Sequence, residues 1–262
     1  TGKATTKPFP VYQIKRIGYK LTLSYAINRA CRVITVSETI KKQILREYKI
    51  DPGNIFVTYE SGKLDESVTI SSESSSKSRD KFPYPYLLYV GNAHPHKNLE
   101  ILIHAFPVVL EHYPKFKLVL IGKQDFFYDR LVGLVKKKKL EKNIMFPGEI
   151  DNVNLPSWYQ NAAAFIFPSK SEGFGIPGLE AMSMSCPVIA ADTTTFHEIY
   201  GEAVLYFDPA STEQLVKSIV DLMSDGKLKN QLINKGKRKA GEYSWNKMAR
   251  ETLKIYESCT RI

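Results

Sequence analysis

Short apolar runs alternate with longer segments of helical spacing between residues 84 and about 240. The apolar runs are YLLYVG, FKLVLIG, NIMFPG, AAFIFPS, PVIAAD and AVLYFD. Between them lie segments such as NLEILIHAFPVVLEHY and FYDRLVGLVKKKKL, whose apolar positions recur every three or four residues. Strands that alternate with helices in this way form a parallel sheet covered on both faces. The pattern predicts an α/β domain with a doubly wound parallel sheet.

The first 63 residues contain fewer elements. RVITV and NIFVTY read as strands, with a helix between them that begins after Ser37, a good N-cap residue. Residues 11–30 predict an earlier amphipathic helix. Its apolar side would carry Ile14, Ile17, Leu21 and Tyr25. Two strands and two helices are too few for an independent α/β domain, so we expect the remnant of a second domain whose beginning is absent.

The segment between these regions has a different composition. The stretch DESVTISSESSSKSRDKFPYP is rich in serine and charge and ends in two prolines, which is typical of a linker or mobile loop. We therefore predict three parts: residues 1–63 as a remnant domain, residues 64–83 as a linker, and residues 84–262 as the sheet domain.

Composition narrows the class of protein. The chain has 262 residues, of which 43% are hydrophobic, and contains no run of about 18 apolar residues that would span a membrane. No secretory signal is recognisable. The three cysteines lie far apart and show no metal-ligand spacing, so we expect reduced thiols that serve packing. These features favour a cytoplasmic protein, with a peripheral position at the inner membrane face as a further option.

The net charge of +10 calls for an anionic partner or a solvated basic surface. A phosphate-bearing ligand and an anionic membrane both fit. No nucleic-acid recognition motif is present, and the lysine run at residues 136–139 reads best as a solvated helix face. Basic residues and tyrosines share the first predicted helix. That helix could therefore lie on anionic lipid, or it could pack against the absent domain.

The segment SEGFGIPGLEAM follows the strand AAFIFPS and carries the clearest chemistry. In a doubly wound sheet, ligands bind beyond the carboxyl ends of the strands. Gly175 would let backbone approach a ligand, and the free N–H groups of a helix beginning near Pro177 would attract phosphate. Carboxylates accept paired hydrogen bonds, so Glu180 suits a ribose diol and Glu172 a sugar ring. An ordinary loop-to-helix turn is the alternative for this stretch alone.

The segment YVGNAHPHKN forms a second candidate part of the same site. Gly91 ends a strand, and Lys97 stands where the next helix begins, so its ammonium group could neutralise a diphosphate. Gly122 and Gly148 end two further strands and would bring backbone to the same edge. Taken alone, this segment could also be a turn with a solvated lysine.

Together these motifs resemble the retaining glycosyltransferases of family 4, which have the two-domain GT-B fold. The resemblance rests on LLYVGNAHPHKNLEILIHAF, FKLVLIGK, NIMFPGEI, FIFPSKSEGFGIPGLEAM, CPVIAAD and YSWNKMARETLKIYES. It covers residues 84–258 continuously, and ACRVITVSETIKKQILREY is similar to the end of the family's acceptor domain. It implies that the sheet domain is the Rossmann-like, C-terminal half of a GT-B protein.

The resemblance also implies roles for individual residues. Lys97 and the amides near Gly175 would hold the diphosphate, Glu180 the ribose, and Glu172 the donor sugar, with Glu172 and Lys97 at the reacting centre. Backbone near Gly148 and Ile150 would meet the base. The implied donor-binding set is Gly91, Asn92, Gly122, Gly148, Ile150, Phe174, Gly175, Ile176, Pro177 and Glu180.

Three positions depart from the family pattern. Asn92 stands where many relatives carry arginine, Ser185 replaces a usual glycine, and His197 stands where proline is common. The family's acceptor-side glycine loop and its histidine belong to the absent part. The sequence contains no Asp-x-Asp pair, so we expect no metal at the diphosphate, and no cofactor apart from the nucleotide-sugar co-substrate.

The implied activity is retaining, metal-independent transfer of a sugar from a GDP- or UDP-type donor to a saccharide or lipid-linked acceptor, with a weak preference for GDP-mannose-like donors. The alternative is a non-catalytic nucleotide-sugar-binding subunit, or a fragment that needs a separate acceptor domain. The fold class also permits a nicotinamide dehydrogenase. We disfavour it because we identify no Gly-x-Gly-x-x-Gly that follows a strand.

Overall fold

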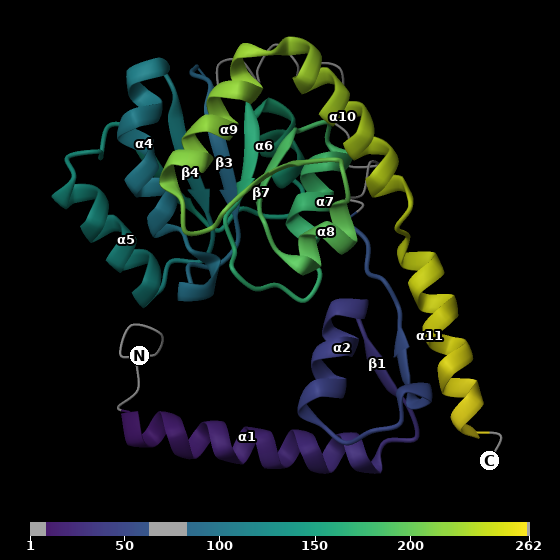
Figure 1. Cartoon of the computed structure of the whole chain (residues 1–262). Coiled ribbons are helices and arrows are strands. Elements are labelled where there is room, and N and C mark those ends of the chain that lie inside the picture. Colours follow the sequence, from purple (N-terminus) through teal and green to yellow (C-terminus); the bar gives the residue numbers. More distant parts are fainter. Residues whose placement is uncertain (1–8, 63–82, 261–262) are drawn as a thin grey trace. The chain divides into compact units, whose positions relative to one another are not determined.

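A computed structural model describes residues 9–62 and 83–260 of the chain (Figure 1). These residues form two compact units. One contains residues 61–243 apart from the segment outside the described ranges, and the other combines residues 9–60 with residues 244–260. The predicted domains had placed the C-terminal helix with the sheet, whereas this division groups it with the N-terminal residues.

The larger unit is built on a six-stranded sheet in which every pairing is parallel. Its strands are β3 (Tyr86–Val90), β4 (Lys117–Ile121), β5 (Ile144–Gly148), β6 (Ala164–Phe167), β7 (Val188–Ala191) and β8 (Leu205–Phe207). Their order across the sheet is β5-β4-β3-β6-β7-β8. The chain therefore reverses its direction of travel between β3 and β6, which is the topological switch point of a doubly wound sheet.

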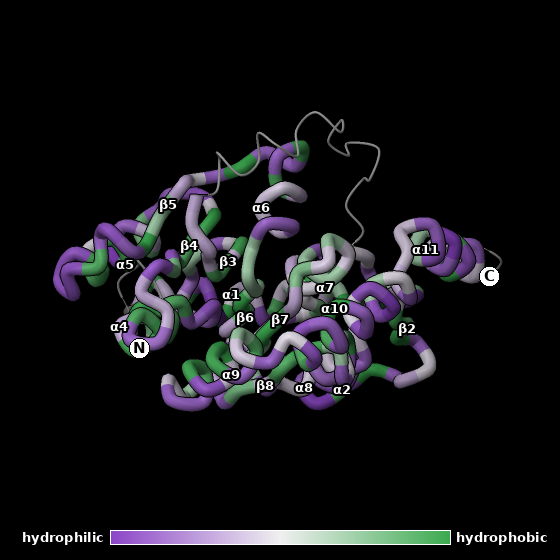
Figure 2. The backbone as a smooth tube through the Cα atoms, turned by 90° about the horizontal axis from the view of Figure 1, so that it is seen from above, coloured by the Kyte–Doolittle hydropathy of each residue, from purple (hydrophilic) through white to green (hydrophobic). Residues whose placement is uncertain are grey.

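Helices cover both faces of this sheet. They are α4 (Glu100–His112), α5 (Phe126–Lys137), α6 (Leu155–Asn161), α7 (Ile176–Ser183), α8 (Thr194–Tyr200), α9 (Thr212–Ser224) and α10 (Gly226–Gly241). Helix α4 packs beside α9, and α7 packs beside α6 and α10. Figures 1 and 2 show these two groups on opposite sides of the strands. All residues of β6 and β7 are buried, which explains why the strands read as continuous apolar runs.

Several helices begin where the sequence supplies a side-chain cap. The Ser37 hydroxyl accepts a hydrogen bond from the Ile40 amide, as predicted. Asp125 accepts from two amides at the start of α5, and Thr193 accepts from the Phe196 amide at the start of α8. These caps satisfy amide groups that have no partner within the helix.

The smaller unit contains α1 (Phe9–Arg29), β1 (Val33–Thr35), α2 (Glu38–Glu47), a short 3-10 turn (Pro52–Asn54), β2 (Ile55–Val57) and α11 (Trp245–Thr260). Strands β1 and β2 pair in parallel. The predicted first helix is present, and its predicted apolar group, Ile14, Ile17, Leu21 and Tyr25, is exposed. Among the described residues, no helix combines the length and apolar character needed to cross a membrane.

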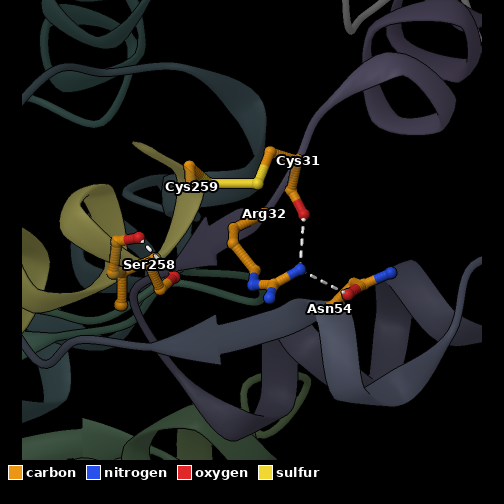
Figure 3. The surroundings of a disulfide bond; sticks show 6 residues. Cys31, Arg32, Asn54, Ser258 and Cys259 are labelled. Carbon is orange, nitrogen blue, oxygen red and sulfur yellow. Dashed lines mark hydrogen bonds between the residues drawn. A yellow bond between two sulfur atoms is a disulfide. The ribbon is translucent and has the colours of Figure 1, made fainter. Parts of the chain in front are cut away.

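A disulfide joins Cys31 to Cys259, with the two Cα atoms 6.0 Å apart (Figure 3). The prediction of three reduced thiols was therefore wrong for this pair. The cause is the return of α11 to the N-terminal residues, which places two cysteines 228 positions apart next to each other. Beside the disulfide, the Arg32 guanidinium donates to the Cys31 carbonyl oxygen at 3.0 Å and to the Asn54 side-chain oxygen at 2.9 Å. Cys186 is a buried free thiol, and burial raises its pKa to about 12.

Candidate functional site

The loops that follow β3 and β6 meet at the carboxyl edge of the sheet. The Lys170 amide donates to the His96 carbonyl oxygen at 2.8 Å. The Asn98 side-chain amide donates to the carbonyl oxygens of Pro168, at 3.2 Å, and Pro209, at 2.9 Å. Asn98 adopts a left-handed conformation with φ of 60°, which asparagine tolerates better than most residues. The switch point therefore brings together the two segments that the sequence singled out.

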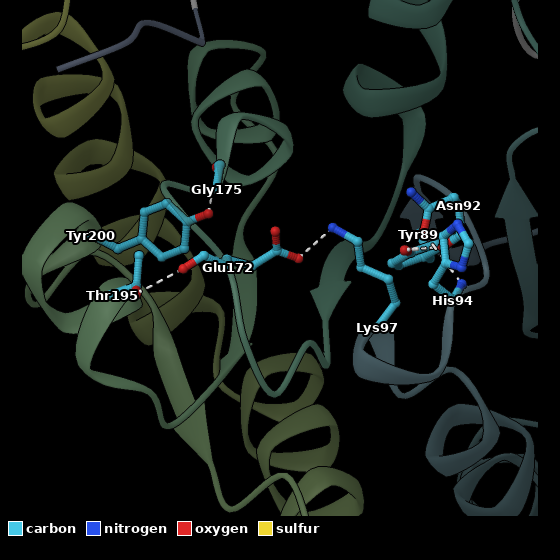
Figure 4. A network of polar contacts seen from close by, with 8 residues as sticks. All are labelled: Tyr89, Asn92, His94, Lys97, Glu172, Gly175, Thr195 and Tyr200. Carbon is cyan, nitrogen blue, oxygen red and sulfur yellow. Dashed lines mark hydrogen bonds and ion pairs between the residues drawn. The ribbon is translucent and has the colours of Figure 1, made fainter. Parts of the chain in front are cut away.

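Lys97 and Glu172 form an ion pair in which the Lys97 Nζ lies 2.5 Å from the Glu172 Oε1 (Figure 4). Only 15% and 12% of their side chains, respectively, are exposed. The sequence indicated both residues but treated them as two separate contacts to a ligand. In the structure, each is the other's partner. A pair this well shielded from water is less screened than a surface pair, so its charges act strongly on whatever binds beside it.

The loop after Glu172 turns sharply into α7. Gly175 has a φ of +111° and immediately precedes the helix, and Pro177 lies in its first turn. A positive φ of this kind favours glycine, so the predicted glycine-bearing turn is present. Ile176 and Pro177 are half-buried, whereas Phe174 is buried and its ring packs edge-on against Tyr243 at 5.4 Å.

Glu180 has a partner that the sequence did not indicate. The Tyr159 hydroxyl, on α6, donates to the Glu180 Oε2 at 2.8 Å, and Tyr159 is fully buried. Burial raises the pKa of Glu180, while the hydrogen bond from Tyr159 acts in the opposite direction. Tyr159 was missed because an aromatic residue in PSWYQNA reads as helix core, and nothing in its spacing points toward α7.

The three glycines at strand ends lie on one connected edge. The Gly91 amide donates to the Ile121 carbonyl oxygen at 3.0 Å, and the Gly122 amide donates to the Gly148 carbonyl oxygen at 3.0 Å. A Cβ at position 122 would collide with the Gly91 carbonyl oxygen. The backbone at these three strand ends is therefore adjacent, and its contact with a ligand stays a prediction. Ile150, two residues beyond Gly148, is half-buried.

Asn92 faces its own loop. Its backbone carbonyl oxygen accepts a hydrogen bond from the Tyr89 hydroxyl at 2.7 Å, and its side-chain oxygen accepts from the His94 amide at 3.2 Å. Asn92 thus stabilises the turn that leads to Lys97.

The pKa of His96, in the same turn, is lowered, first by burial and then by the neighbouring Lys97 charge.

The expectation that no Gly-x-Gly-x-x-Gly follows a strand was wrong for the spacing itself, because Gly173, Gly175 and Gly178 match it in the segment GFGIPG. They lie beyond β6, after the intervening residues 168–172, and not in the first turn of the sheet, where a dinucleotide fingerprint occurs. The spacing therefore does not indicate a nicotinamide site here.

Fold and site define a doubly wound domain with charged and glycine-lined loops at its switch point. Residues 71–239 match the family described as glycosyl transferases group 1. This match covers more than half of the chain, which therefore belongs to that family.

Known proteins agree with this membership. The chain is 28% identical over 254 residues to the O-antigen chain mannosyltransferase B of Escherichia coli, a match that covers 95% of this chain and 66% of that protein. The sucrose-phosphate synthase of Thermosynechococcus elongatus has a similar structure, with a TM-score of 0.80, 22% identity, and coverage of 94% of this chain and 62% of that one.

Anabaena HepE, solved in complex with UDP and glucose, has a TM-score of 0.79 and 18% identity, and the match covers 94% of this chain and 67% of that one. These likenesses establish the fold. The predicted Rossmann-like fold of GT-B glycosyltransferases is confirmed.

Proposed function

We propose that this chain forms the donor-binding half of a retaining, metal-independent glycosyltransferase. The substrate would be a GDP- or UDP-type nucleotide sugar, and the acceptor a saccharide or lipid-linked saccharide. The observation that carries the proposal is the shielded ion pair between Lys97 and Glu172 at the switch point, next to the glycine turn that begins α7. Family membership supports it, and the mannosyltransferase relative favours a donor that carries mannose, such as a GDP-mannose-like one.

Donor binding would separate the ion pair. The diphosphate would take the place of the Glu172 carboxylate on the Lys97 ammonium group and would also meet the amides that begin α7. The released Glu172 carboxylate would then accept hydrogen bonds from hydroxyls of the sugar, while Glu180 accepts from the ribose diol. Lys97 and Glu172 would thereby bind each other in the empty site and bind the donor in the occupied site.

In the transfer step, the bond between the anomeric carbon and the diphosphate oxygen breaks. The acceptor oxygen bonds to that carbon on the same face, and its proton passes to the departing phosphate. Lys97 and the helix amides stabilise the charge that develops on the leaving group, so this chain contributes positioning and electrostatics.

Two substitutions with different expected effects test this proposal. Isothermal titration calorimetry would measure binding of GDP and UDP to the wild type, Lys97→Ala and Glu172→Gln. Lys97→Ala should weaken the preferred nucleoside diphosphate by about tenfold or more, because a charge-assisted contact is lost. Glu172→Gln should bind it as tightly or more tightly, because the competing carboxylate is gone, yet should bind the corresponding nucleotide sugar more weakly. Equal affinities in all three proteins would refute the site.

A thermal-shift screen with sugars linked to UDP, GDP, ADP and dTDP would identify the donor. Binding to the folded state alone raises the midpoint of unfolding, and the rise grows with affinity. The screen requires no acceptor and can be done with this chain alone. A midpoint that none of the four classes raises would contradict donor binding.

A second candidate is a non-catalytic nucleotide-sugar-binding subunit, or a fragment that works with a separate acceptor domain. The favouring observation is that the chain spans 66% of the length of the Escherichia coli mannosyltransferase that it matches. Turnover that appears only when an acceptor domain is added would support a fragment of an enzyme. Donor binding without turnover in either condition would support a binding subunit.

A peripheral position on the cytoplasmic membrane face is a further part of the proposal. Helix α1 carries Lys15, Arg16, Lys20 and Arg29, has no acidic residue, and exposes several large apolar side chains. Such a helix suits an anionic lipid surface. Co-sedimentation with vesicles should increase with their content of anionic lipid and fall with salt, and binding independent of both would contradict the electrostatic attachment.

A further inference from the structure

We propose that Thr195 and Tyr200 are positioning residues for the donor site, and that α8 braces the loop of residues 172–175 through these two side chains. The inference rests on the proposed function, because it assigns the braced loop to the diphosphate and the sugar. Neither residue was indicated by the sequence, and neither needs to touch the donor to act.

Two hydrogen bonds connect α8 to the loop. The Thr195 hydroxyl donates to the Glu172 carbonyl oxygen at 3.0 Å, and the Tyr200 hydroxyl donates to the Gly175 carbonyl oxygen at 2.5 Å. Figure 4 shows both contacts on the side of the loop away from Lys97. The accepting carbonyl groups lie at the two ends of the segment 172–175. The loop is therefore tied at both ends to one short helix.

The donors are themselves well fixed. Tyr200 is fully buried and Thr195 is 5% exposed. The Tyr200 ring stacks on Phe196 at 5.0 Å between ring centroids, and Phe196 lies 4.8 Å from Phe167 at the end of β6. Since a buried side chain packed in this way has few rotamers available, its hydroxyl group occupies a defined place.

Tyr200 also shapes the turn sterically. A Cβ at either Gly175 or Gly178 would collide with the Tyr200 hydroxyl, so the two glycines and the tyrosine form one fitted contact. Glycine-containing loops have more backbone freedom than others, and fixing that freedom before the ligand arrives reduces the entropic cost of binding. The brace therefore sets where the Glu172 carboxylate and the first amides of α7 point.

The test removes each hydroxyl while keeping the shape of its side chain. Tyr200→Phe and Thr195→Val should increase hydrogen exchange at the amides of residues 173–176, measured on the protein without ligand. With the nucleotide sugar chosen by the thermal-shift screen, both variants should bind about tenfold more weakly. Affinity for the matching nucleoside monophosphate should stay within about twofold, because Glu180 and the Gly148 region lie outside the braced segment.

Two further variants control for general damage. Thr195→Ser keeps the hydroxyl and should restore donor affinity. Tyr206→Phe removes the hydroxyl of a half-buried tyrosine, which donates to the Phe196 and Gly201 carbonyl oxygens at α8 and does not contact the loop. It should leave both exchange at 173–176 and the ratio of sugar-nucleotide to monophosphate affinity unchanged.

The outcomes separate this inference from the proposed function. Unchanged exchange in Tyr200→Phe and Thr195→Val overturns the brace, whatever binds. Increased exchange in a protein that binds no nucleotide sugar supports the brace and contradicts the proposed function. Increased exchange with equal losses of nucleotide-sugar and monophosphate affinity overturns the positioning role, because it indicates a general loss of structure.

Discussion

At the scale of residues, Glu180 shows which features of the candidate site the sequence could predict and which it could not. Its position after a glycine turn indicated a polar ligand, and Glu172 was found by the same reasoning. Their protein partners were not predictable, because Tyr159 approaches Glu180 through the packing of α6 against α7, and Lys97 meets Glu172 because the loops that follow the neighbouring strands β3 and β6 lie side by side. Contacts of this kind depend on which elements become neighbours.

The buried position of Glu180 predicts a pH-dependent stability. Burial raises its pKa, so the folded protein holds this proton more strongly than the unfolded chain does. The free energy of unfolding contributed by this group therefore falls as pH rises through the interval between the unfolded and the folded pKa. Glu180→Gln cannot ionise and should melt at a higher temperature than the wild type at neutral pH.

Melting curves between neutral and acidic pH would check the effect. The difference between Glu180→Gln and wild type should shrink as pH falls toward the ordinary glutamate pKa of about 4.3. Glu149→Gln, at an exposed position, should show no such trend. A difference that is constant across pH would contradict the buried carboxylate as its source.

At the scale of elements, the apolar runs predicted the four central strands β3, β4, β6 and β7 well, because almost every residue of these strands is buried and burial leaves a continuous signal in the sequence. Helix ends were less predictable. Helix α7 ends through Ser185, which has a left-handed φ of 63°. The Ser185 amide donates to the Met182 carbonyl oxygen and the Cys186 amide donates to the Ala181 carbonyl oxygen, and these two hydrogen bonds cap the C-terminus of the helix. This geometry favours glycine at position 185.

Ser185→Gly should consequently stabilise the protein. A residue with a Cβ is strained in the left-handed region, and glycine is not, although glycine also gains freedom in the unfolded chain. We expect a net gain of about 0.5–1 kcal/mol in the free energy of unfolding, measured by urea denaturation. Ser183→Gly, at the last residue of α7, is the comparison variant and should destabilise by about 0.5 kcal/mol or more, because glycine has the lower helix propensity and the hydroxyl that donates to the Glu180 carbonyl oxygen at 2.8 Å is lost. Destabilisation at both positions would contradict the strain at Ser185.

At the scale of the whole molecule, the sequence predicted one sheet domain and one remnant domain, but it did not predict the compact unit to which α11 belongs. Its helical spacing was clear, whereas its grouping with residues 9–60 depends on the path of the chain. The bond between Cys31 and Cys259 follows from that path. Cysteine spacing could not reveal it, because no local motif relates positions 228 residues apart.

Reduction of this disulfide should lower stability. A cross-link restricts the unfolded chain, and loss of one typically costs about 2–4 kcal/mol. Wild-type protein should melt at a lower temperature in dithiothreitol. Cys259→Ser should have a similarly low melting temperature whether or not dithiothreitol is present. Cys186→Ala retains the bond and should respond to dithiothreitol as the wild type does. Identical melting of wild type with and without reductant would contradict a bond that supports the fold.

The same bond makes the chain between residues 31 and 259 a closed covalent ring. A single protease cut anywhere inside that ring, including the serine-rich stretch before the sheet, would open it without producing separate fragments. The nicked protein would migrate as one band on a denaturing gel and split into two pieces only after reduction.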